Sequence, residues 1–173
     1  MRFIKLGLIS AIALFLVITA LSLLFPAHMR VSRAVNIAAP REKVYRVAGE
    51  LKTWSGWNHF VSDTNSALTG RSLSTPSVGK GAFWRSDQLK ITVRSSSPDS
   101  IRMDWDQAKG RNFTGGFNLL QLYPDSLTVQ WYFDFHFHWY PWEKFGGLVY
   151  DKKLGYIMEE SLTDLKRYVE NSP

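Results

Sequence analysis

Residues 127–138, LTVQWYFDFHFH, alternate strictly between apolar and polar side chains. The odd positions hold Leu, Val, Trp and three Phe, and the even positions hold Thr, Gln, Tyr, Asp and two His. Side chains on a strand point to opposite faces in turn, so this pattern predicts an antiparallel strand over Ser126–His138. One face of that strand then meets a core or cavity, and the other, with His136 and His138, meets water.

The polar face of this stretch raises the question of a metal site. Neutral imidazoles two positions apart on a strand are able to converge on one zinc ion, given a further ligand from a neighbouring strand. Asp134 and His138 are, however, about 13 Å apart along an extended strand, too far to meet one ion easily together with His136. We therefore expect solvated surface histidines and assign no metal ligand.

The N-terminal segment differs in kind from the rest of the chain. Leu6 to Ala27 carries no charge, with Arg2 and Lys5 before it and Arg30 after it. A membrane span needs about 20 apolar helical residues, so residues 1–30 are predicted to be a single-pass transmembrane anchor in the cell membrane. The alternative is a cleaved signal peptide, because Ala20-Leu21-Ser22 is an acceptable cleavage site. The basic flanks are nearly balanced and assign the domain to neither side of the membrane.

The formal net charge of +6 does not indicate nucleic-acid binding. Arg2, Lys5, Arg30 and Arg33 precede the first acid, Glu42, and from Ala34 onward the charges nearly cancel. The basic excess is therefore mostly membrane-flanking, and no nucleic-acid partner is expected. The chain has no cysteine, which excludes disulfides, thiolate metal sites and a cysteine nucleophile.

Residues 31–173 are expected to form one α+β domain. A strand is predicted in VSRAVNI (31–37), a helix from Pro40 through Leu51, a short helical turn within residues 53–60, and a long C-terminal helix over Trp142–Glu170 that starts late or bends near Gly155. Between them, period-two patterns predict strands over Ser66–Arg71, Gly79–Asp87, Leu89–Ser95, Ser100–Gln107, Asn112–Tyr123 and Ser126–His138. The predicted inward residues of two of these are Leu89, Ile91 and Val93, then Ile101, Met103 and Trp105.

In order and spacing, these segments resemble the START/Bet v 1-like helix-grip superfamily (SRPBCC), and within it the polyketide cyclase/dehydrase-like branch. The resemblance rests on VSRAVNIAAPREKVYRVAGELKTWSGWNHF with its Trp54-x-x-Trp57 element, on Gly81 to Trp84, on SLTVQW, and on the closing helix YDKKLGYIMEESLTDLKRYVE. It covers nearly everything after Arg30. It implies a curved antiparallel sheet wrapped around a long C-terminal helix, here preceded by one transmembrane helix.

The resemblance further implies a cavity between the sheet and the helix, which relatives use for lipids, quinones, polyketides or other hydrophobic molecules. Its expected lining residues are Trp57, Trp84, Met103, Trp105, Phe117, Trp131, Phe133, Phe135, Leu154, Ile157 and Met158. Relatives share no universal catalytic residues, and the chain has no Gly-x-Ser-x-Gly motif, so no catalytic residue and no cofactor is assigned.

Several interpretations stay open at this point. Trp54 and Trp57 either form a lip over the cavity entrance or pack in the core. Trp139, Tyr140 and Trp142 either anchor at the membrane interface or pack at the cavity rim. The inward aromatics either line an open cavity or close it.

The leading functional hypothesis is membrane-tethered binding of a hydrophobic small molecule or lipid without catalysis. The alternative is a polyketide cyclase or hydrolase-like enzyme, which needs Asp104, Asp106, Asp134 or His136 to turn inward through a bulge. A third possibility, a structural membrane module, predicts a closed core and an exposed apolar patch. The pattern assigns no oligomeric state.

Overall fold

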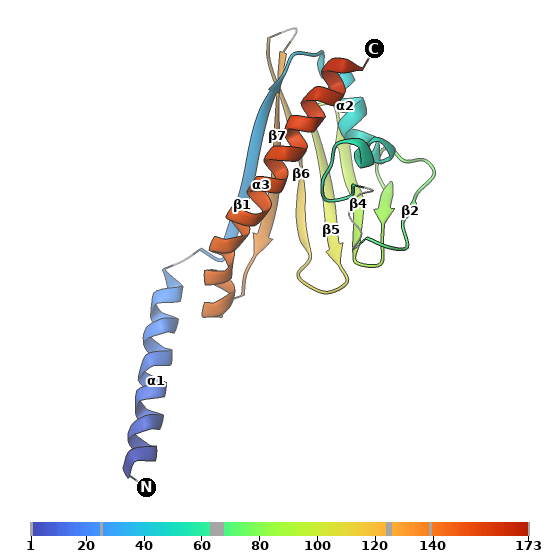
Figure 1. Cartoon of the computed structure of the whole chain (residues 1–173). Helices are drawn as coiled ribbons and strands as arrows, with labels where there is room; N and C mark the ends of the chain where they lie inside the picture. Colours follow the sequence, from blue (N-terminus) through green and yellow to red (C-terminus); the bar gives the residue numbers. More distant parts are fainter. Residues whose placement is uncertain (1, 25, 63–67, 124–125, 139, 173) are drawn as a thin grey trace.

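Seven antiparallel strands pair in the order β1-β7-β6-β5-β4-β3-β2, and a long C-terminal helix packs across one face of this sheet (Figure 1). The computed structural model describes residues 2–24, 26–62, 68–123, 126–138 and 140–172. A separate N-terminal helix projects from one end of the domain. This arrangement is an α+β helix-grip fold, as the sequence predicted.

The strands follow the sequence predictions most closely in the centre of the sheet. They are β1 (His28–Ile37), β2 (Ser72–Leu73), β3 (Phe83–Arg85), β4 (Leu89–Ser97), β5 (Ser100–Gln107), β6 (Phe113–Tyr123) and β7 (Ser126–His136). β1 begins three residues earlier than predicted, and His28 pairs with His136 at the start of its ladder with β7. β7 stops at His136, and the backbone N–H of His138 instead donates to the Glu143 carboxylate at 2.8 Å.

Two predicted strands are wrong in extent. The described part of Ser66–Arg71 is not a strand, and residues 63–67 lie outside the described residues. Of Gly79–Asp87, only Phe83–Arg85 is a strand, because Gly79 and Gly81 have φ angles of 81° and 88°. A positive φ is incompatible with extended β geometry, so the ladder cannot begin before residue 82.

The helices are α1 (Arg2–Leu23), α2 (Arg41–Gly49), the 3-10 helix η1 (Leu51–Gly56) and α3 (Pro141–Asn171). Pro40 precedes α2, and Pro141 stands in the first turn of α3, where its missing N–H costs no hydrogen bond. The expectation that the last helix starts late was wrong, since α3 begins one residue before the predicted Trp142. Gly155 is helical within it.

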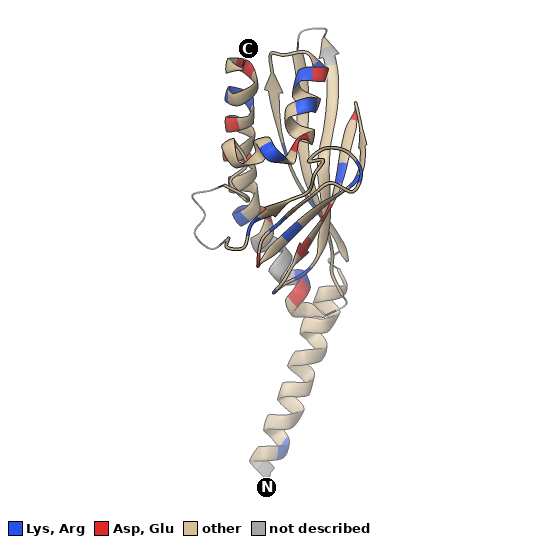
Figure 2. Ribbon diagram, turned by 90° about the vertical axis from the view of Figure 1, so that its right-hand side faces the viewer, with Lys and Arg blue, Asp and Glu red and all other residues tan. Residues whose placement is uncertain are grey.

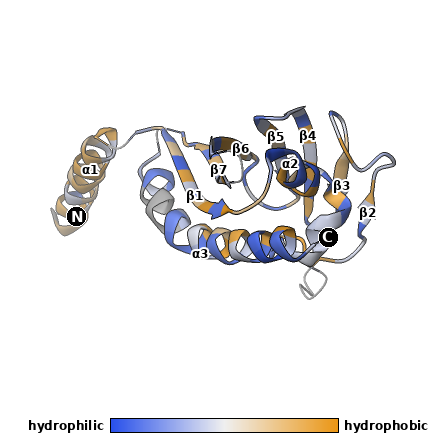
Figure 3. Cartoon of the chain, turned by 90° about the horizontal axis from the view of Figure 1, so that it is seen from above, coloured by the Kyte–Doolittle hydropathy of each residue, from blue (hydrophilic) through white to orange (hydrophobic). Residues whose placement is uncertain are grey.

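The alternation predicted for β7 and β5 is realised in the core. Leu127, Val129, Trp131, Phe133 and Phe135 are all at most 2% exposed. Ile91, Val93, Ile101, Met103 and Trp105 are equally buried, and Leu89 is partly buried against them. These side chains belong to one hydrophobic core. Figure 3 shows α3 running along one face of the sheet.

α1 ends at Leu23, and its apolar side chains are largely exposed. In Figure 2 the ribbon of α1 is coloured for a basic residue near its N-terminal end and is otherwise mostly tan, whereas both charge signs are interspersed over the domain. Phe3–Leu23 is long and apolar enough to cross a membrane, a property shared by signal sequences. Arg30 and Arg33, interpreted from sequence as membrane flanks, lie within β1 and form ion pairs with Asp134 and with Asp151 and Glu159.

Candidate ligand-binding site

The interior between the sheet and α3 contains a contiguous cluster of aromatic rings, here called the aromatic cluster. Trp105 lies 4.9 Å from Phe133, and Phe117 lies 5.1 Å from Trp131, measured between ring centroids. The members come from η1 and the loop after it, β5, β6 and β7: Trp54, Trp57, Phe60, Trp105, Phe113, Phe117, Trp131, Phe133 and Phe135.

Strand register brings these rings together. Trp131 pairs with Phe117 across β7 and β6, and Trp105 pairs with Phe113 across β5 and β6. Phe133 pairs with Gly115, where a Cβ atom would lie 2.5 Å from the Phe133 ring. Gly115 is therefore the position at which the sheet makes room for Phe133.

The aromatic contacts continue to the end of the domain at which α1 attaches. Phe133 contacts Phe135, Phe135 stacks on Phe137, and Phe135 also stacks on Tyr150 of α3 with centroids 5.1 Å apart. Tyr150 is 39% exposed. An apolar series of contacts thus runs from the deep interior to the surface near the start of α3.

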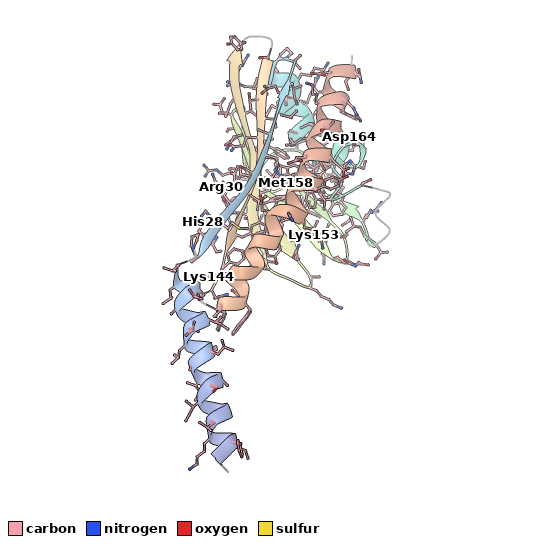
Figure 4. All side chains as sticks on the ribbon, turned by 60° about the vertical axis from the view of Figure 1, so that its left-hand side comes forward. His28, Arg30, Lys144, Lys153, Met158 and Asp164 are labelled. Carbon is pink, nitrogen blue, oxygen red and sulfur yellow. The ribbon has the colours of Figure 1, made fainter. Side chains whose placement is uncertain are left out.

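The predicted lining residues fall into two groups. Trp57, Trp105, Phe117, Trp131, Phe133 and Phe135 meet in the aromatic cluster. Met103 and Met158 are buried beside it, Leu154 is partly buried against the core, and Ile157 is half-buried on α3 (Met158 is labelled in Figure 4). Trp84 is 7% exposed on β3, and within the described residues no ring contact joins it to the cluster.

Three members of the aromatic cluster are absent from the lining residues expected from the sequence. Phe113 shares the inward alternation of Gly115 and Phe117 and was within reach of the period-two argument. For Trp54 the sequence left open a position at the cavity entrance or in the core, and the structure places it fully buried beside Trp57. Phe60 lies in a loop after η1, where no periodicity indicates its direction.

In this state the rings touch one another. Trp54 and Trp57 are 0% and 2% exposed, which places them in the core and not at a lip. A ligand of appreciable size is accommodated among the cluster only if these rings move apart. Hollows at the periphery include about 370 Å³ beside Tyr45 and Val78 and about 420 Å³ on the outer face beside Arg30 and Arg102.

Not every polar atom in the interior is satisfied. The indole N–H of Trp54 donates to the carbonyl of Ala48 at 2.9 Å. By contrast, the indole nitrogens of Trp57, Trp105 and Trp131 and the amide nitrogen of Asn58 are buried and have no hydrogen-bond partner.

Asp134, His136 and His138, which were considered as metal ligands and not assigned, do not converge on one point of the structure. Asp134 accepts two hydrogen bonds of 2.7 Å from Arg30, and this contact holds the pKa of Asp134 below its usual value. The His136 ring contacts the His28 ring with centroids 4.7 Å apart and the ring planes tilted by 54°, and His138 lies 3.2 Å from Glu143. Within the described part of the chain, no three His, Cys, Asp or Glu side chains are arranged to hold a metal ion.

The acids considered for catalysis do not turn inward. Asp104 pairs with Arg94 at 2.9 Å on the outer face, and Asp106 and His136 occupy the same face. A pair that the sequence did not indicate, His59 and Asp164, lies 2.8 Å apart beside α3 and is partly exposed. The nearby Ser161 hydroxyl accepts from the His59 backbone N–H and donates to the Ile157 carbonyl, so no base activates it.

The first turn of α3 contacts the last turn of α1. Lys144, only 8% exposed, donates from Nζ to the carbonyl of Ser22 at 3.0 Å (Lys144 is labelled in Figure 4). A cation at a helix C-terminus satisfies a carbonyl left without an intrahelical partner. Nearby, Trp142 is 63% exposed and stacks on Tyr140, whereas Trp139 lies outside the described residues.

The sequence matches one known protein family over most of its length. A family model described as "Polyketide cyclase / dehydrase and lipid transport" matches residues 28–170. A search among curated proteins finds no match.

Solved structures share the fold at low identity. A protein of unknown function, SA2116 from Staphylococcus aureus, is 12% identical with a TM-score of 0.64 over 83% of this chain and 94% of that one. A START superfamily protein from Mycobacterium smegmatis is 17% identical, with a TM-score of 0.58 over 82% and 97%. Truncated norcoclaurine synthase from Thalictrum flavum is 10% identical, with a TM-score of 0.57 over 84% and 96%.

Proposed function

Because the chain belongs to the polyketide cyclase/dehydrase and lipid transport family, we propose that it is a membrane-tethered binder of a hydrophobic small molecule or lipid. The ligand occupies the interior between α3 and strands β5 to β7. Its lining consists of the aromatic cluster together with Trp84, Met103, Leu154, Ile157 and Met158.

The observation that carries this proposal is the continuity of the aromatic contacts. They extend from Trp57 through Trp131 and Phe133 to Phe135, and then to the partly exposed Tyr150 near the α1 end of the domain. Ligand sites are mostly apolar with few polar groups, and this interior has that composition. An apolar molecule in the bilayer therefore has a short apolar route into the domain.

The tether is supported by the last turn of α1. Ser22 is fully buried, and its carbonyl accepts from the nearly buried Lys144 of α3. A retained anchor accounts for such a contact, whereas a signal peptide cleaved near Ala20 or Ser22 would remove it. Holding the domain at the membrane raises its encounter rate with ligands dissolved there.

We propose no catalytic step. The interior-facing positions of the described strands carry no acid and no histidine, and general acid–base catalysis needs such a group at the bound substrate. The enzyme norcoclaurine synthase shares the fold at 10% identity, which supports the architecture and not an activity.

Native mass spectrometry tests the binding. The full chain, extracted from its membranes in mild detergent, should carry a hydrophobic adduct that lipid analysis identifies. Leu154→Trp, which adds bulk at the seam between α3 and the sheet, should reduce the bound fraction, whereas His136→Ala on the outer face should not. A bare mass for the wild-type protein under conditions that preserve lipid adducts on other membrane proteins would contradict the proposal.

A further inference from the structure

Four hydrogen-bond donors in the interior lack an acceptor. Trp57, Trp105, Trp131 and Asn58 are each at most 2% exposed, and their side-chain nitrogens have no partner. Buried donors are normally paired, because leaving one unpaired forfeits the hydrogen bond that water would supply. Several orphans in one place therefore call for an explanation.

These donors belong to one neighbourhood. The Trp131 ring contacts the rings of both Trp57 and Trp105, with centroids 6.3 Å and 6.4 Å apart. Asn58 follows Trp57 directly, and its Oδ1 already accepts from the Phe60 backbone N–H at 3.0 Å. The acceptor end of the Asn58 amide is thus in use, and its donor end is not.

These four side chains offer hydrogen-bond donors to one another but no free acceptor. An indole offers one donor and no acceptor, so the tryptophans cannot satisfy one another through conventional hydrogen bonds. Edge-to-face contacts within the cluster permit weak N–H···π interactions, which do not replace a hydrogen bond to oxygen. Trp54 shows the contrast, because its N–H reaches the Ala48 carbonyl.

We infer that the interior selects an apolar molecule that carries hydrogen-bond acceptors, such as a ketone or ester oxygen, over a hydrocarbon of the same shape. Its oxygens accept hydrogen bonds from the N–H groups of Trp57, Trp105, Trp131 and Asn58, about two for each carbonyl oxygen, while the surrounding rings contact the apolar frame. This inference rests on the proposed function and specifies the chemical class of its ligand. A site with buried donors discriminates strongly against an analogue that leaves them unpaired.

The test uses two probes that differ by one oxygen, 9-fluorenone and fluorene. The full chain is labelled with 15N-tryptophan and placed in lipid nanodiscs, and the seven indole N–H signals are assigned with single Trp→Phe variants. The single carbonyl oxygen of fluorenone accepts about two hydrogen bonds, so fluorenone should shift at least one of the Trp57, Trp105 and Trp131 signals downfield. The Trp54 signal, already hydrogen-bonded, and the Trp142 signal, exposed on α3, serve as internal controls and should not move downfield.

Affinity gives the second readout. After correction for partition into empty nanodiscs, fluorenone should bind at least about tenfold tighter than fluorene. Trp131→Phe keeps an aromatic ring but removes one donor, and should lower that ratio. Trp105→Phe provides an independent second variant if Trp131→Phe does not fold.

The outcomes separate the two proposals. Equal affinity for both probes, with no selective downfield shift, overturns the inference and leaves a general hydrophobic binding site. Binding of neither probe overturns the inference and the proposed function together. Tight fluorenone binding that shifts the Trp54 signal as much as the largest shift among Trp57, Trp105 and Trp131 also overturns it, because the unpaired donors would then play no special part.

Discussion

Phe133 shows how one residue connects the sheet to the interior. Its ring lies over Gly115 and contacts Trp105, Phe113 and Trp131. Phe133→Ala should lower the free energy of unfolding by about 3–5 kcal/mol, because it leaves a cavity in a closely packed region. His136→Ala, three positions along the same strand on the outer face, should stay within about 0.5 kcal/mol. Urea unfolding of both variants measures the difference. If His136→Ala lowered the free energy of unfolding as much as Phe133→Ala does, the assignment of Phe133 to the core face and His136 to the outer face of β7 would be contradicted.

Glu143 gives a prediction about pH at the start of α3. Arg111, together with the backbone and side chain of His138, lowers the pKa of Glu143 from 4.5 to about 2. A carboxylate with a depressed pKa in the folded state stabilises the fold above its unfolded pKa, and this contribution is lost as pH falls from about 4.5 through about 2. A double-mutant cycle of Arg111→Gln and Glu143→Gln should therefore show coupling at pH 7 that is mostly lost at pH 2, where about half of the Glu143 carboxyl groups are protonated. Coupling that persists unchanged at pH 2 would exclude the ion pair as its source.

At the residue scale, alternation predicted burial well where one face meets the core. It failed at Tyr132, an outer-face residue that is 7% exposed because the Arg30 guanidinium lies 4.6 Å above its ring. Arg30 lies on β1, and its guanidinium donates to Asp134, which lies on β7 together with Tyr132. This contact holds the guanidinium over the Tyr132 ring. The sequence suggested that Arg30 flanks a membrane span. No local pattern in the sequence indicates its ion pair with Asp134, which lies about a hundred positions away.

Helix α3 and strand β1 meet at Gly155, where Arg33 crosses the helix to reach Asp151 and Glu159. A Cβ atom at Gly155 would lie 2.1 Å from the Arg33 guanidinium. Gly155→Ala gains about 1 kcal/mol of helix propensity but displaces Arg33 from partly exposed ion pairs worth up to about 1 kcal/mol each. The substitution should thus stabilise an Arg33→Ala background by about 1 kcal/mol and the wild-type protein by clearly less. Thermal melts of the four proteins decide this, and equal gains in both backgrounds would show that Arg33 does not constrain the helix.

At the element scale, long and strongly periodic segments were predictable and irregular ones were not. Ser100–Gln107 was predicted to the residue, and the long final helix to within one residue at either end. The short strand β2 at the sheet edge and its neighbour β3 were misplaced, because Gly70, Gly79 and Gly81 have positive φ and interrupt the two longer strands that the pattern suggested. The suggestion that Gly155 weakens the helix followed from propensity, whereas in the structure its missing side chain makes room for Arg33.

The whole molecule is predicted to remain in the membrane through α1. Carbonate extraction of the full chain should leave it in the membrane fraction, and a chain beginning at His28 should be released. The intact mass of the membrane-bound protein should include residues 1–27. Release of the full chain by carbonate, or an intact mass that corresponds to a mature chain beginning near Leu23, would favour a signal peptide instead.

The architecture of the domain was predictable from the order of its segments, because helix-grip proteins share that order more than any single motif. Most of the rings that meet in the interior were predictable too, since inward alternation indicates which side chains of a strand face the core. Whether those rings enclose space or fill it depends on side-chain packing between strands, which no local pattern encodes. The orphan indole donors emerged only from the three-dimensional contacts.

The central claim is that a hydrophobic molecule binds between α3 and strands β5 to β7. An experimental structure of the full chain, isolated in discs of its own membrane lipids, tests this most directly. The account predicts ligand density among the rings of Trp57, Trp105, Trp131 and Phe133, with those rings parted relative to the packed state described above. Rings packed as they are here, with any co-purified molecule bound elsewhere, would contradict it.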